Sequence, residues 1–127
     1  MPTTNTVTTL QARKKFAKAR AGEITLPKID KIAFGDGGHD AENEPVFPDS
    51  DLEEVPGEFI QKDVDEITAE DTTVKVKGTL TREDTEKTVV SAIGLYDEDG
   101  DLSAVKTLYS PFEGDPITFE VDWDEQY

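Results

Sequence analysis

Alternation of apolar and polar residues is clearest in the second half of the chain and predicts β-strands there. In Thr73–Leu80 one face carries three apolar side chains and a glycine, and the other carries lysine and threonine. Ile117–Trp123 repeats the pattern, with apolar residues opposite acids and threonine. Between them, the largely apolar run Thr88–Tyr96 is typical of a central strand, because both faces of such a strand are buried.

A tight hairpin is predicted over Ile93–Lys106. Asp97–Gly100 has turn chemistry and separates the central strand from a return strand, Leu102–Tyr109. Gly100 supplies the residue that a tight turn needs, because glycine adopts positive φ without steric cost.

The first half has a weaker strand pattern. Ile29–Phe34 is the best strand candidate there, and Pro27 marks the residues before it as an edge or lead-in. Residues 40–57 are acidic, contain three prolines and predict a long surface loop. Glu58–Ile67 is a further strand candidate, with moderate alternation.

Glycines are also predicted to form structural turns. These glycines are Gly35, Gly37, Gly38, Gly94 and Gly100.

Near the N-terminus the pattern changes to that of a short helix. Leu10–Ala21 is rich in helix-forming residues, with Thr8 or Thr9 as a cap and Gly22 as a stop. Its apolar stripe is thin: Leu10, Phe16, Ala17 and Ala21. A helix this short is marginal alone, so it must pack on its own sheet or on a partner. Residues 1–8 predict a flexible arm.

These elements define the predicted fold class. It is α+β: a mainly antiparallel, sandwich-like sheet domain with one N-terminal helix and a long acidic loop. At 127 residues the chain fits one domain, which we place at residues 9–127 after the arm.

Charge is distributed unevenly along the chain. Residues 1–22 hold five bases and no acid, giving +5, whereas the remaining eight bases and twenty-nine acids give −21. A basic head on an acidic body indicates electrostatic docking, although a solvated helix face explains it equally well. The candidate partner-docking residues are Leu10, Arg13, Lys14, Phe16, Lys18 and Arg20.

The residues that could carry chemistry give no assignable active site. The absence of cysteine excludes thiol nucleophiles and cysteine-bound zinc. His39 is the only histidine and has no nucleophile beside it in the sequence. Asp97, Asp99 and Asp101 have calcium-loop spacing, but Leu102 and Leu108 occupy the positions of the required glycine and bidentate acid. We therefore expect no enzymatic activity, no cofactor and no metal.

A net charge of −16 in a small chain also suggests an alternative, an acidic DNA mimic. Such a protein inhibits a basic nucleic-acid-binding protein by presenting carboxylates where phosphates would lie. The basic head weakens this interpretation.

Two blocks carry a resemblance to a known family. LPKIDKIAFGDGGHD at Leu26–Asp40 and AIGLYDEDGDLSAVKT at Ala92–Thr107 resemble, in that order, the N-terminal domain of phage tail-collar fibre proteins. The likeness covers roughly residues 13–123. It implies a short stand-alone structural protein of a contractile phage tail or phage-tail-like particle, which docks fibres or receptor-binding proteins to the baseplate. By this resemblance we expect the protein to lack the fibre shaft and receptor-binding tip of the larger family members.

The resemblance also implies partners and a location. We expect baseplate and fibre proteins as partners and assembly as a homotrimer, without nucleic acid, membrane span or small-molecule substrate. The sequence has no apolar run of the roughly 20 residues that a membrane helix needs. It has no N-terminal hydrophobic segment typical of a signal peptide. We expect the protein to be cytoplasmic at synthesis and then part of a tail or baseplate.

Overall fold

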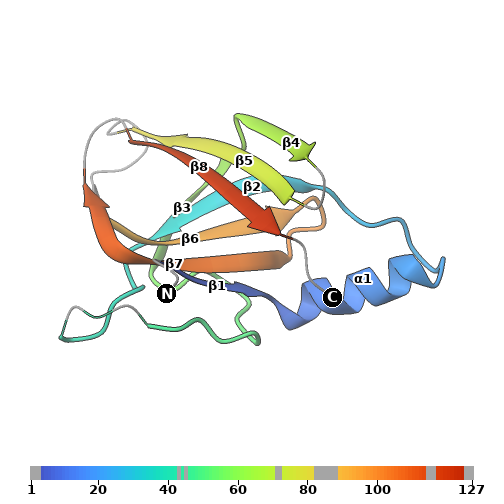
Figure 1. The fold of residues 1–127 in the computed structure, drawn as a ribbon, viewed down its shortest axis with the longest axis horizontal. Coiled ribbons are helices and arrows are strands. Elements are labelled where there is room, and N and C mark those ends of the chain that lie inside the picture. Colours follow the sequence, from blue (N-terminus) through green and yellow to red (C-terminus); the bar gives the residue numbers. More distant parts are fainter. Residues whose placement is uncertain are drawn as a thin grey trace.

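The computed structural model describes residues 4–42, 44, 46–70, 73–81, 89–113 and 117–124. Within these residues, eight strands and one helix follow each other (Figure 1). Their bounds are β1 Thr4–Thr8, α1 Leu10–Arg20, β2 Ile29–Gly35, β3 Glu58–Asp63, β4 Glu66–Glu70, β5 Thr73–Leu80, β6 Val89–Asp97, β7 Leu102–Glu113 and β8 Ile117–Asp124.

The strands form two antiparallel sheets. The larger sheet has the order β1-β7-β6-β2-β3, and the smaller has the order β4-β5-β8. Figure 1 shows the smaller sheet lying across the larger one, with α1 at one end of the molecule. The predicted α+β class, mostly antiparallel sheet with a single short helix, is therefore confirmed.

The main core lies between the two sheets. Val76 and Leu80 of β5 are buried in one cluster with Ile32 and Phe34 of β2 and Ile93 of β6. This arrangement confirms the inward face predicted for Thr73–Leu80. It follows from the two-residue repeat of a strand, which sends alternate side chains to the same face.

A second core covers the opposite face of the large sheet. Ala33, Tyr96 and Val105 are buried there against Val55, which belongs to the connection between β2 and β3. The long acidic surface loop expected at residues 40–57 is not shown. Part of that connection packs on the sheet instead, and Thr107 donates a hydrogen bond to the carbonyl of Val46 at 2.6 Å.

Two expectations about the strands are wrong. Thr4–Thr8 is not an arm without regular structure, because it forms β1 and pairs with β7 from Thr4 to Thr8. Residues 1–3 of that arm lie outside the described part. The single strand predicted over Glu58–Ile67 is two strands in different sheets. The amide of Val64 bonds to Asp30 in the large sheet, and the next amide, of Asp65, bonds to Lys77 in the small one.

Candidate functional site

Helix α1 is attached to the sheet at its first turn. The hydroxyl of Thr9 accepts a hydrogen bond from the Ala12 amide at 3.2 Å and donates one to the Leu102 carbonyl at 2.6 Å. Thr9 is therefore the N-cap, as one of the two predicted candidates, and it also binds the helix to β7. Gly22, with φ of 81°, follows the helix end as predicted.

The side of α1 that packs on the protein differs in part from the predicted stripe. Phe16 is buried as expected, together with Ala12, which the stripe did not include. Leu10 is 42% exposed, and Ala17 and Ala21 are exposed too. The helix therefore buries a narrower face than its apolar residues predict.

The opposite side of α1 is basic. The four cationic docking candidates, Arg13, Lys14, Lys18 and Arg20, are all exposed. Within the part of the chain that the structure describes, none of them forms an ion pair with an acid. Arg13 and Arg20 line a shallow hollow together with Ala17 and Ala21. The structure thus brings the cationic docking candidates together on one exposed surface, while Phe16 lies on the other side of the helix.

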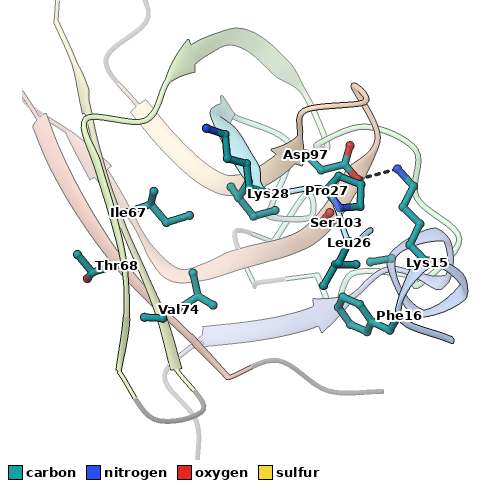
Figure 2. A pocket seen from close by; sticks show the side chains of 13 residues that line it. Lys15, Phe16, Leu26, Pro27, Lys28, Ile67, Thr68, Val74, Asp97 and Ser103 are labelled. Atoms are coloured by element: carbon teal, nitrogen blue, oxygen red, sulfur yellow. Dashed lines mark hydrogen bonds and ion pairs between the residues drawn. The ribbon is translucent and has the colours of Figure 1, made fainter. Parts of the chain in front are cut away.

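Lys15 has a different environment, which sequence reasoning missed. Its ammonium nitrogen lies 2.7 Å from a carboxylate oxygen of Asp97, 3.2 Å from Asp99 and 2.7 Å from Asp101 (Figure 2 draws the first contact). Burial lowers the pKa of Lys15, but the hydrogen bonds that its ammonium donates to Asp101, Asp97 and Asp99 outweigh this effect, and the pKa rises above its ordinary value. The lysine therefore holds α1 against the hairpin as a charged group.

The same aspartates shape the β6–β7 turn. Asp97 is only 2% exposed, and its second carboxylate oxygen accepts the amides of Asp99 at 3.0 Å and Asp101 at 3.1 Å. Gly100 has φ of 88°, which confirms the predicted hairpin turn. The carboxylates whose spacing raised the calcium alternative thus have backbone amides and a lysine ammonium as their partners.

The other glycine predictions divide into two groups. Gly94 is not at a turn: it lies within β6, where an added Cβ would come 2.2 Å from Val55. Gly35, Gly37 and Gly38 border the irregular connection after β2, and each has backbone atoms too close for a side chain. The absent side chains therefore allow the connection between β2 and β3 to pack on the sheet.

His39 lies in this connection. Its Nε2 donates a hydrogen bond to the Leu108 carbonyl at 2.6 Å. This hydrogen bond joins the β2–β3 connection to β7, so the imidazole stabilises the fold at this point.

An apolar groove lies between α1 and the small sheet, and no local pattern in the sequence predicted it. Figure 2 shows Ile67 and Val74 on one side and Leu26, Pro27 and Phe16 on the other. Its volume is about 450 Å³. Leu26 is 45% exposed and Ile67 37% exposed at its rim. An open apolar groove of this size is typical of a binding surface.

Among the described residues, no group of histidine and acidic side chains is arranged to hold a metal ion. No helix in that part of the chain combines the length and apolarity needed to cross a membrane.

Comparison of the chain with protein-family models, with curated proteins and with solved structures finds no match.

Proposed function

We propose that this protein is a non-catalytic docking component of a contractile phage tail or phage-tail-like particle, attaching fibres or receptor-binding proteins to the baseplate. The two sequence blocks at Leu26–Asp40 and Ala92–Thr107 support the tail assignment by their resemblance to tail-collar fibre proteins. The first block includes β2, and the second makes up the β6–β7 hairpin that holds α1.

The observation that carries the docking function is the position of α1. Its buried side is fixed to the hairpin through Thr9 and Lys15, so the opposite side presents its cations on a rigid support. A preorganised surface loses little conformational entropy when it binds a partner. Basic side chains on that surface favour an acidic patch on a baseplate subunit, a fibre subunit or another copy of this chain.

Charge reversal on the exposed helix face tests this function. The double variant Arg13→Glu with Arg20→Glu should assemble into tails poorly, while the matched variant Arg13→Lys with Arg20→Lys should assemble normally. The fraction of tails that contain the protein can be measured after purification of particles. Deletion of residues 1–22 is a poorer test, because it removes β1 and the buried Phe16. Normal incorporation of the charge-reversed protein would contradict the proposal.

We further propose a homotrimer, as the fibre resemblance implies, and measurement of the mass in solution tests it directly. A monomer at high concentration would contradict the trimer while leaving the docking function open.

The alternative of an acidic DNA mimic is less favoured, because the rigid face of α1 presents positive charge. A mimic should bind a basic nucleic-acid-binding protein and should release it as salt screens the charges.

A further inference from the structure

The end strand of the small sheet, β4, has an open edge. All five of its residues are exposed, and it pairs with β5 on one side only among the described strands. The unpaired amides and carbonyls of such an edge can accept another strand. Binding by strand addition uses these main-chain groups for affinity and the alternating side chains for specificity.

The inner face of β4 adjoins the apolar groove. Ile67 and Ala69 line the groove from β4, and Leu26 and Pro27 line it from the segment before β2. A strand added to the open edge would direct alternate side chains to the same face as Ile67. Apolar side chains at those positions would cover the exposed parts of Ile67 and Leu26.

The outer face of β4 indicates what the other side chains of the added strand should be. It carries Glu66, Thr68 and Glu70. On the paired side, β5 places Lys77 opposite Glu66 and Lys75 opposite Thr68.

The paired side also shows how these charges interact. Lys75 forms an ion pair with Glu70 at 3.2 Å. On β5, which carries Lys75, the inward side chains Val74 and Val76 are apolar. The strand that β4 already binds therefore alternates valine and lysine, and the open edge presents the same glutamates to a second strand.

We propose that the open edge of β4 and the adjoining groove bind an extended segment of a partner protein in which apolar residues alternate with lysine or arginine. The segment pairs with Glu66–Glu70 through its backbone, fills the groove with its apolar side chains and places its cations beside the two glutamates. This inference rests on the proposed docking function and names the chemistry of one partner.

A second copy of this chain fits the open edge poorly. Antiparallel pairing of two β4 strands centred on Thr68 would set Glu66 of each copy opposite Glu70 of the other. Like charges directly opposite each other across a strand pair are destabilising. The charge of the edge therefore favours a basic strand over self-association.

The test measures binding of short blocked peptides to the full chain by fluorescence anisotropy. A peptide that alternates lysine and valine should bind about tenfold more tightly than one that alternates glutamate and valine, since several cross-strand charge pairs contribute. The variant Glu66→Lys with Glu70→Lys should reverse this preference. Substitution Ile67→Glu should abolish binding of the first peptide, whereas Phe47→Glu, at an exposed apolar residue outside the groove lining, should leave it unchanged.

Three results would overturn the inference. These are equal affinity for the two peptides, no binding to the unmodified chain, and a dimer of the unmodified chain that Ile67→Glu dissociates. Thermal melts of each variant confirm that the protein is folded during the binding measurement. The charge-reversed α1 variant separates this inference from the proposed function: loss of tail incorporation with intact peptide binding assigns the two contacts to different surfaces.

Discussion

Lys15 Nζ lies 2.7 Å from Asp97 Oδ2, and this contact joins a helix near the N-terminus to a hairpin 82 residues later in the chain. Asp99 and Asp101 add two further carboxylates around the same ammonium. The contact is internal to the protein, so the charge of this lysine is balanced within the fold, unlike that of the exposed cations of α1.

Replacement of Lys15 by methionine should destabilise the fold. The buried carboxylate of Asp97 would lose its cation while retaining a similar apolar neighbour, and we expect a loss of about 2 kcal/mol in the free energy of unfolding. Lys14→Met is the matched control, since Lys14 is exposed and its replacement should change stability by no more than about 0.5 kcal/mol. Urea denaturation of the three proteins measures both values, and equal stability of the two variants would contradict the role of Lys15.

Alkaline pH should also weaken the fold. The pKa of Lys15 is raised above 10.5 as described, and the pKa of Tyr96 is raised above 10.0 by burial and by its hydrogen bond to Glu58. Both protonated forms are favoured by folding, so their stabilisation is complete below pH 10 and declines as the pH rises through the folded-state pKa values. Denaturation midpoints between pH 8 and pH 12 should fall above about pH 10.

The Tyr96→Phe variant separates the two contributions to this pH dependence. Its stability should fall less steeply above pH 10, because the contribution of Tyr96 is then absent while that of Lys15 remains. A slope identical to that of the unmodified protein would exclude Tyr96 from the effect.

Loss of the Thr9 hydroxyl should lower the free energy of unfolding more than loss of an ordinary helix cap does. Thr9→Val keeps the shape but removes both the acceptor for Ala12 and the donor to Leu102, so we expect a loss of about 2 kcal/mol. Thr9→Ser retains the hydroxyl and should lose much less. Thermal unfolding of the two variants makes the comparison, and equal losses would show that the methyl group matters more than the hydrogen bonds.

Gly94→Ala should destabilise the protein by steric conflict with Val55. The added Cβ would lie 2.2 Å from a Val55 methyl and 2.9 Å from a Leu102 methyl, and overpacking of this kind costs about 1–3 kcal/mol. The double variant with Val55→Ala should lose less than the sum of the two single changes, because the smaller side chain makes room. Additive losses measured by urea denaturation would contradict this explanation.

The sequence predicted those elements whose residues carry their own local signal. The hairpin turn is correct because Gly100 and Asp97 specify it within a few residues, and β5 is correct because its alternation matches one buried face. The predicted bounds of α1 are nearly correct, because Thr9 caps its N-terminus and Gly22 follows its C-terminus.

The parts that were missed depend on contacts between distant segments. Nothing local to Thr4–Thr8 indicates that β7 is available to pair with it. The chain changes sheets at Val64 and Asp65 because neighbouring amides bind different strands, and alternation alone does not report that change. Of the candidate site, the basic face of α1 could be predicted, whereas the groove required Ile67 and Leu26 to be brought together from separate segments.

The pairing of β1 with β7 has a consequence for biosynthesis. Val7 lies opposite Val105, and Thr8 lies opposite Ala104, so β1 pairs with a strand that is synthesised much later. Pairings this distant in sequence slow folding, because a long loop must close before any contact compensates for its entropy. The strand β1 and the basic helix after it therefore remain without their native support until β7 has been synthesised, and the nascent chain in that interval is a candidate for binding by chaperones.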